Sequence, residues 1–335
     1  MNIFIWSLVI SSLISPLLAN PFAVQVPSKE KLSVEDYIDI QKQLQAIDVT
    51  SMLKELYVPD QGLTSFEGFA SRCMRGASQI IIDQENGLIP IRQLEKIGQG
   101  GDRCIVCYVP YVANEWGRIV KNLAEYVKSN VSALQATGFN GYFYYQIGGF
   151  PNPTGKEMQY VGVPYCAKIF MMLEAYKLGF KKVLWVDSAL LPLRNPSSFF
   201  IWIERRDHFV QGWLTPSNAG SFILPATRQV LQNLTGTDVL KAPYINSVIF
   251  GLKMDAPLAQ KLIEDYYHLV EVGTPFLSCF PEEFVLTALL GKPEFSAWVP
   301  MNMTLFLKSH DTTPPTPGNM QKLKDEGYFF YQRPQ

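Results

Sequence analysis

The chain has 335 residues, enough for one large α/β domain or two ordinary ones with a sizeable core. Apolar residues make up 47% and charged residues 18%, a composition typical of a globular protein and not of a disordered one. The formal net charge is −1, with 29 basic and 30 acidic residues and no long block of one sign, so nucleic acid is not an expected partner.

The first 19 residues predict an export signal. Residues 3–18 are almost entirely apolar, and the small residue Ala19 precedes a polar, proline-bearing stretch, which is typical of a secretory signal cleaved near Ala19. No Lys or Arg precedes the apolar run, so a retained anchor stays open as an alternative, although the run is short for a membrane span. We expect an exported protein (periplasmic, secreted or in a secretory-pathway lumen) with no stable transmembrane span after signal removal.

Residues 20–100 are expected to form an N-terminal helical extension. The capping box that begins at Ser33 and the apolar residues spaced behind it predict a helix over about 34–56, which ends before Pro59. The glycine-rich stretch 98–101 is a turn and not a phosphate loop, because it precedes a strand and no Lys-Ser or Lys-Thr follows it. No chemical motif occurs in this region.

Residues 101–312 show alternating strand and helix patterns, which predict an α/β fold with a mainly parallel sheet flanked by helices. The expected strands cover 104–108, 142–147, 183–186, 208–214 and 245–252. The remaining residues, 313–335, are rich in turn formers and are expected to form a C-terminal tail outside the core.

Five cysteines allow at most two internal disulfides. Cys104 and Cys107 have CxxC spacing, but they lie in a strand-like run. Residues three apart on a strand point to opposite faces of the sheet, so this pair cannot grip one metal ion. Without a second CxxC, the sequence does not predict a structural zinc site.

The chain is organised around the stretch 181–196, in which the short apolar run 183–186 ends abruptly at Asp187. The preceding helical pattern, 164–179, begins at a proline and ends at a glycine. An acid at the carboxyl end of a buried strand lies where open α/β sheets bind ligands. The alternative is that Asp187 only forms a turn or caps the next helix.

Hydrolase chemistry is poorly supported by the sequence. The chain has three histidines, no Gly-x-Ser-x-Gly elbow and no His-Glu-x-x-His motif. These absences argue against a serine-hydrolase triad and exclude a zincin-type metal site.

The stretch from Tyr165-Cys-Ala-Lys168 through Gly179-Phe-Lys-Lys-Val-Leu-Trp-Val-Asp187 to Arg194-Asn-Pro resembles nucleotide-sugar glycosyltransferases of the GT-A fold, a Rossmann-related fold. The similarity covers roughly residues 103–310 and is strongest over 164–196. It implies that Asp187 corresponds to the first acid of the family's DxD motif, which holds the donor ribose or a diphosphate-bound Mn²⁺ or Mg²⁺.

The second acid of that motif is absent, because Ala189 stands in its place. A divalent cation bridging a diphosphate normally binds one or two carboxylates, so two possibilities follow. Either another ligand completes the metal site, and His310 is the candidate, or no metal is used. In the second case Lys168 and Arg194 are the nearest cations that could neutralise the departing diphosphate.

A second acidic pair, Glu282 and Glu283, follows Pro281 at an expected helix start. In an inverting transfer, either carboxylate could act as the general base that deprotonates an acceptor hydroxyl. The alternative is purely structural, since acids in a first helical turn stabilise the positive end of the helix. Trp185 lies within a buried strand and is expected to be core.

The resemblance therefore implies a protein that transfers a hexose from a nucleotide-sugar donor to a glycan, lipid or protein acceptor. Because the metal motif is incomplete and the chain carries an export signal, the alternative is a non-catalytic glycan- or partner-binding protein on the same scaffold. The two hypotheses differ in whether Asp187 meets Glu282, Glu283 and His310 in one cleft of the folded chain.

Overall fold

The computed structural model describes residues 20–29, 32–57, 66, 90–109, 117–213, 222–309, 313 and 315–334. The predicted signal over 1–19 and the candidate ligand His310 lie outside these ranges. Within them, no helix combines the length and the apolar character needed to cross a bilayer.

The fold is built on a mixed seven-stranded sheet with the order β1-β3-β2-β4-β7-β6-β8. Strands β2, β3 and β4 pair in parallel, whereas β1 and β7 run antiparallel to their neighbours, so five of the seven strands share one direction. The predicted α/β fold with a mainly parallel sheet flanked by helices is confirmed. The strands are β1 (Ile91–Ile97), β2 (Arg103–Val109), β3 (Gly141–Ile147), β4 (Lys182–Val186), β6 (His208–Trp213), β7 (Tyr244–Lys253) and β8 (Met301–Asn302).

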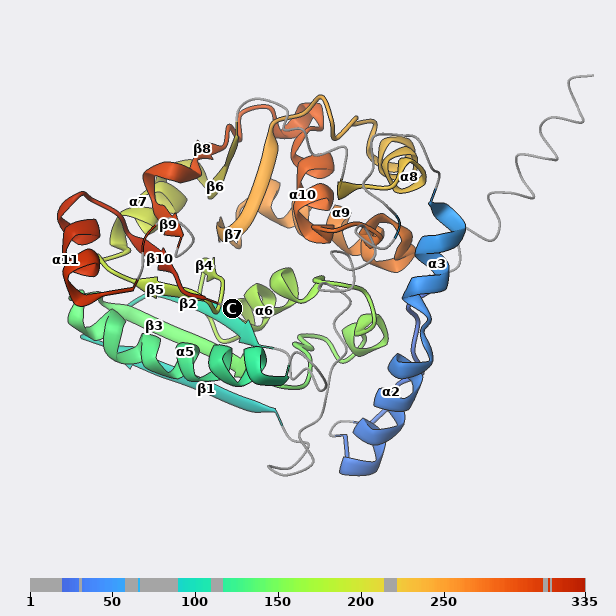
Figure 1. Ribbon diagram of the computed structural model, residues 1–335, viewed down its shortest axis with the longest axis horizontal. Coiled ribbons are helices and arrows are strands. Elements are labelled where there is room, and N and C mark those ends of the chain that lie inside the picture. Colours follow the sequence, from blue (N-terminus) through green and yellow to red (C-terminus); the bar gives the residue numbers. More distant parts are fainter. Residues whose placement is uncertain are drawn as a thin grey trace, which may run out of the picture.

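Helices cover both faces of the sheet and give two apolar cores (Figure 1). Cys104 of β2 belongs to one core and Cys107 to the other, which confirms that their side chains point to opposite faces. The four described cysteines, Cys104, Cys107, Cys166 and Cys279, are buried. One face is covered by α6 (Ala167–Lys177), α8 (Pro225–Thr235), α9 (Pro257–Val272) and α10 (Pro281–Leu290), and the other by α5 (Gly117–Ala136) and α7 (Ser197–Arg206).

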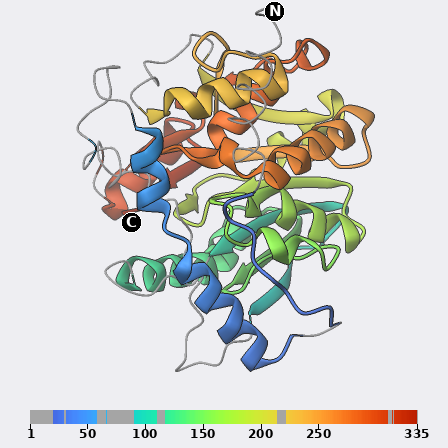
Figure 2. The same cartoon turned by 90° about the vertical axis from the view of Figure 1, so that its right-hand side faces the viewer.

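The N-terminal segment forms two helices where one was expected, α2 (Val34–Ala46) and α3 (Val49–Leu56). The capping box at Ser33 is present, but Ile47 is extended and the Asp48 side chain begins a new helix by accepting from the Ser51 amide at 2.9 Å. Both helices run along one side of the molecule, at the right in Figure 1 and in front in Figure 2. Ile40, Leu44 and Leu53 join them to the main core.

Assigning all of residues 20–100 to a helical extension was wrong, because β1 belongs to the main sheet. It pairs antiparallel with β3 along its whole length, from Ile91 opposite Ile147 to Ile97 opposite Gly141. Most of its side chains are exposed, so the period-2 apolar pattern that marks a half-buried strand is weak. The sheet therefore begins before the predicted boundary at residue 101.

The assignment of residues 313–335 to a tail outside the core was also wrong. Strand β10 (Phe330–Gln332) lies between β5 (Leu190–Pro192) and β9 (Leu307–Ser309) in a second, three-stranded sheet, preceded by α11 (Pro317–Asp325). Phe330 and Tyr331 are completely buried. Because β5 starts three residues after Asp187 and pairs with β10, the C-terminal segment packs close to the end of β4.

Candidate functional site

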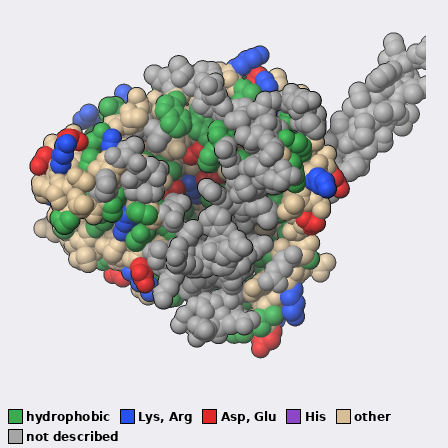
Figure 3. Space-filling model, viewed as in Figure 1, with side chains coloured by type: hydrophobic (Ala, Val, Ile, Leu, Met, Phe, Trp, Pro, Cys, Tyr) green, Lys and Arg blue, Asp and Glu red, His purple; other side chains and the backbone are tan. Residues whose placement is uncertain are grey.

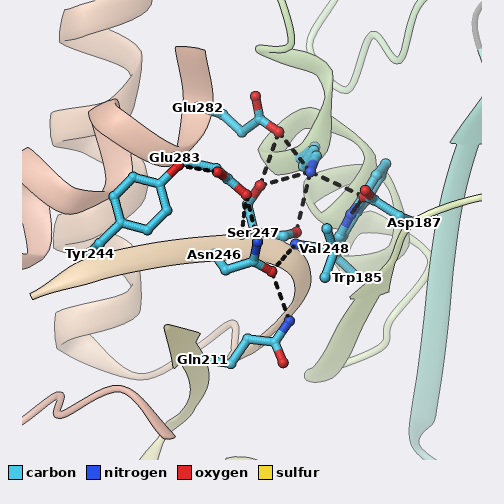
Figure 4. A network of polar contacts seen from close by, with 10 residues as sticks. Trp185, Asp187, Gln211, Tyr244, Asn246, Ser247, Val248, Glu282 and Glu283 are labelled. Atoms are coloured by element: carbon cyan, nitrogen blue, oxygen red, sulfur yellow. Dashed lines mark hydrogen bonds and ion pairs between the residues drawn. The ribbon is translucent and has the colours of Figure 1, made fainter. Parts of the chain in front are cut away.

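Four chain segments meet at the carboxyl end of β4 and form one polar cluster (Figure 4). Asp187 follows β4 directly, Lys168 lies in the first turn of α6, and Glu282 and Glu283 lie in the first turn of α10. The antiparallel strand β7 extends past the end of β4 and carries Ser247 into the same region. Ligands of open α/β sheets bind at this edge.

Lys168 is the centre of the cluster. Its Nζ lies 3.0 Å from Asp187 Oδ1 and 2.7 Å from Glu282 Oε1. It also donates to Ser247 Oγ at 2.8 Å and lies 3.2 Å from the Ser247 carbonyl oxygen. Three N–H groups therefore face four oxygen atoms, and the ammonium is saturated. Burial alone would lower the pKa of Lys168, but Asp187 and Glu282 outweigh it and raise this pKa, so the side chain stays charged.

Asp187 is the more accessible carboxylate beside Lys168. Trp185 Nε1 donates to its Oδ1 at 2.6 Å, and its backbone amide donates to the Val248 carbonyl at 2.9 Å. Both side-chain contacts engage Oδ1, and 26% of the side-chain surface remains exposed. Burial raises the pKa of Asp187, and the charge of Lys168 opposes that rise. The carboxylate is thus held in one orientation with part of its surface open.

Glu283 is a buried, fully hydrogen-bonded partner inside the cluster. Its Oε1 accepts from Asn246 Nδ2 at 2.9 Å and from the Ser247 amide at 3.2 Å, and its Oε2 accepts from the Tyr244 hydroxyl. Burial, followed by the charge of Glu282, raises its pKa to about 7. Glu283 therefore fixes the start of β7 against α10.

Glu282 differs from Glu283 in how its oxygens are used. The Ser247 hydroxyl donates to its Oε1 at 2.9 Å, and Lys168 contacts the same oxygen. The hydrogen-bond network extends further to β6, where Gln211 Nε2 donates to Asn246 Oδ1 at 3.0 Å. One oxygen of Glu282 is therefore engaged by two donors, and the cluster spans β4, β6, β7, α6 and α10.

The structure brings together four of the six predicted site residues: Lys168, Asp187, Glu282 and Glu283. Arg194 makes its contacts outside this cluster. Its Nη1 donates to the Gly327 carbonyl at 2.8 Å and its guanidinium lies 5.0 Å from the centre of the Phe329 ring. The chain turns through β5 after Asp187 and carries Arg194 to the second sheet.

Sequence reasoning missed the residues that link the acids. Trp185 is buried as expected, but its indole also donates to Asp187. Tyr244, Asn246 and Ser247 begin an otherwise apolar buried strand and all contact Glu282 or Glu283. The polar residues at the start of this apolar strand could have indicated the cluster in advance, because buried polar side chains need hydrogen-bond partners.

The described residues do not fit a divalent cation bound to Asp187. They contain no group of three or more His, Cys, Asp or Glu side chains that could hold a metal ion. Oδ1 of Asp187 is already engaged, and the charged Lys168 ammonium lies 3.0 Å from it, where it would repel a cation. Ala189, at the position of the second acid, is buried and provides no ligand.

The elements that carry the cluster, β4, β7 and the start of α6, lie near the centre of the view in Figure 1. Figure 3 shows a hollow there, with acidic and basic side chains at its bottom. Tyr165 is 39% exposed, and the charges of Glu282, Lys168 and Asp187 act on its hydroxyl, so it lies next to the cluster. Its φ of +58° is in the left-handed region, which a bulky residue rarely adopts.

The backbone at Tyr165 predicts an unusual order of stability between two truncated variants. Tyr165→Gly is expected to be more stable than Tyr165→Ala by about 1–2 kcal/mol, because both lose the ring but only alanine keeps the left-handed strain. Urea denaturation of both variants measures the difference. The control is Lys322 in α11, whose side chain is 73% exposed and where glycine should be the less stable variant by about 1 kcal/mol. The same order at both positions would contradict the prediction.

No protein-family model and no curated protein matches this chain. Among solved structures, the apo crystal structure of mouse xyloside xylosyltransferase 1 is similar, with 11% sequence identity and a TM-score of 0.31. The similarity covers 79% of this chain and 91% of that chain. This TM-score is too low for the neighbour's activity to be carried over, so functional evidence comes from the cluster of Lys168, Asp187 and Glu282 itself.

Proposed function

We propose that this protein is a glycosyltransferase that transfers a hexose from a nucleotide-sugar donor to a glycan, lipid or protein acceptor. The observation that carries the proposal is the convergence of Asp187 and Glu282 on Lys168 at the carboxyl edge of the sheet. The buried Lys168 ammonium holds both carboxylates there. Asp187 can then bind the donor, and Glu282 can act on the acceptor. We also propose that the chain is exported to a compartment that contains nucleotide sugars.

Asp187 is the proposed donor-binding residue. Its Oδ1 is fixed by Trp185 and Lys168, and its partly exposed carboxylate can accept a hydrogen bond from a ribose hydroxyl. Lys168 has no N–H group left for a phosphate, so it acts on the donor by holding Asp187. This refines the predicted role of Lys168 as a direct donor ligand.

Glu282 is the proposed general base, and Glu283 positions it. Both oxygens of Glu283 are engaged by donors within the protein, whereas the contacts of Glu282 from Lys168 and Ser247 converge on Oε1. In an inverting transfer, Glu282 takes the proton of the acceptor hydroxyl while the acceptor oxygen bonds to the anomeric carbon. The bond from that carbon to the phosphate oxygen breaks, and the nucleoside diphosphate leaves with the electron pair.

The proposal is tested with a panel of nucleotide sugars, measured by thermal shift and by release of the nucleoside diphosphate. We expect at least one donor to raise the melting temperature of the wild-type protein. EDTA should leave that shift unchanged, because the residues around Asp187 do not fit a divalent cation. A strict requirement for Mn²⁺ or Mg²⁺ would instead favour a metal site completed by another ligand such as His310. Absence of any donor binding, with or without metal, would overturn the proposal.

Asp187→Asn is expected to weaken donor binding about ten- to hundredfold, which corresponds to the loss of one charge-assisted hydrogen bond. Asparagine keeps an oxygen for Trp185 Nε1, so circular dichroism should show an intact fold. The control is Asp255→Asn in the surface pair with Lys181, which should leave donor binding unchanged. Equal donor affinity in wild type and Asp187→Asn would contradict the assigned role.

The second candidate is a non-catalytic glycan- or partner-binding protein. Two observations favour this candidate. Acceptors within the protein saturate Lys168, and position 189 carries an alanine, so few charged groups are left for a diphosphate. Glycan binding without donor hydrolysis would support this candidate. Donor turnover that Asp187→Asn abolishes would exclude it.

A further inference from the structure

Arg333 is a buried arginine that contacts the turn directly after Asp187. Its side chain donates hydrogen bonds to backbone carbonyls of that turn, and the residue is 8% exposed. Nη2 donates to the Ser188 carbonyl at 3.2 Å and to the Leu190 carbonyl at 3.3 Å, and Nε donates to the Ala189 carbonyl at 3.3 Å. The Arg333 backbone amide also donates to the Ala189 carbonyl, at 2.9 Å.

Helix α5 supports the guanidinium from the other side. Nη2 donates to Asn130 Oδ1 at 2.9 Å and Nη1 to Ser129 Oγ at 3.0 Å, while the guanidinium lies 4.0 Å from the centre of the Tyr126 ring. The Asn130 amide in turn donates to the Leu190 carbonyl at 2.9 Å. Arg333 and Asn130 therefore both donate to the Leu190 carbonyl.

This arginine has an unusual charge environment. Within the described part of the chain, no carboxylate forms an ion pair with it, and carbonyl dipoles and an aromatic ring surround the charge instead. A buried cation without a counter-ion costs free energy, which a surface position or a neutral side chain would avoid. Burial lowers its pKa to about 10, so the charge persists at neutral pH.

The held turn leads directly to the candidate site. The Leu190 amide donates to the Asp187 carbonyl at 2.9 Å, which closes the turn from Asp187 to Leu190. The Asp187 side chain then meets Trp185 and Lys168. A change in the position of the turn would therefore move the carboxylate relative to the Trp185 indole.

We propose that Arg333 is a positioning residue for Asp187: its planar guanidinium fixes the carbonyls of residues 188–190 and so sets the orientation of the Asp187 carboxylate. The role depends on the fork of donors and not on the charge alone, because a lysine ammonium cannot reach several carbonyls in one plane. The consequence for donor binding rests on the proposed function, whereas the geometry of Asp187 can be measured without a donor.

The test uses the Trp185 indole N–H as a reporter of the Asp187 carboxylate in the full chain. The six tryptophans give six indole signals in a ¹H–¹⁵N spectrum, and Trp185→Phe assigns the relevant one. In Arg333→Gln and Arg333→Lys, the Trp185 signal should shift and its exchange with solvent should accelerate about tenfold, since a loosened turn opens more often. The control Arg228→Gln removes the two-bond ion pair with Asp238 and should leave the Trp185 signal in place.

The outcomes separate this inference from the proposed function. A shifted Trp185 signal in both Arg333 variants supports the inference, even if no donor binds the wild-type protein. If a donor does bind, both variants should bind it about tenfold more weakly. An unchanged Trp185 signal in folded variants overturns the inference, and rescue by lysine overturns the claim that the fork matters. Failure of both variants to fold, while Arg228→Gln folds, would assign Arg333 to global stability and also overturn it.

Discussion

Replacing Lys168 with methionine is expected to lower the free energy of unfolding by about 3–5 kcal/mol, the typical cost of removing one partner from a buried ion pair. The Lys168 side chain is 11% exposed and neutralises Asp187 and Glu282. Methionine fills a similar volume but leaves two carboxylates and the Ser247 hydroxyl without their shared donor. The loss should shrink at low pH, because protonation removes the charges that are left unpaired.

Urea denaturation at pH 7 and at about pH 4 measures both parts of this prediction. The matched control is Lys42→Met, which breaks an ion pair with Asp39 in which both side chains are 69% exposed, and which should cost less than about 1 kcal/mol. Adding Asp187→Asn and Glu282→Gln to Lys168→Met should recover most of the loss. A Lys168→Met protein as stable as the control would show that the three charges do not depend on one another.

The central αβ unit could be predicted because its pattern is local. The helical spacing over 164–179 and the apolar run over 183–186 correspond to α6 and β4, and the run ends where Asp187 meets the cluster. Parallel strands buried on both faces leave continuous apolar runs, which a single sequence shows clearly. The placement of Lys168 near Asp187 follows, because α6 starts at the edge where β4 ends.

The parts that could not be predicted depend on contacts between distant segments. Strand β1 is an exposed edge strand, and β10 follows a proline-rich stretch, so neither has the pattern of a core strand. Arg194 is close to Asp187 in sequence, yet Arg333 is the arginine that holds the Asp187 turn. Proximity in sequence favoured Arg194 because nothing local reveals that β5 pairs with β10.

Sequence reasoning treated Glu282 and Glu283 as equivalent, whereas the fold gives them different partners. Adjacent residues in a helix point in directions about 100° apart, so Glu282 meets Lys168 while Glu283 meets the start of β7. Which acid faces which partner depends on the rotation of α10 against the sheet. That rotation is set by core packing and not by the local sequence.

Glu283→Gln is expected to stabilise the protein at pH 8 by about 2 kcal/mol and to change the pH dependence of its stability. The pKa of Glu283 is raised from 4.5 to about 7 by burial and by the charge of Glu282. Between these values the folded state binds more protons than the unfolded state, so stability falls as pH rises from about 4.5 through 7. The full penalty of about 3 kcal/mol is reached above pH 7, and glutamine removes it while losing part of the hydrogen bonding to Tyr244.

Urea denaturation of wild type and Glu283→Gln from pH 4.5 to 8 measures this difference. The wild-type free energy of unfolding should fall over that window, and the variant curve should be flatter. The remaining slope comes from other shifted groups: the raised pKa of Asp187 lowers stability as pH rises, whereas burial lowers the pKa of His208, which acts in the opposite direction. The control Glu264→Gln, at a side chain that is 79% exposed, should give a curve parallel to wild type. Parallel curves for wild type and Glu283→Gln would show that Glu283 is already charged at low pH.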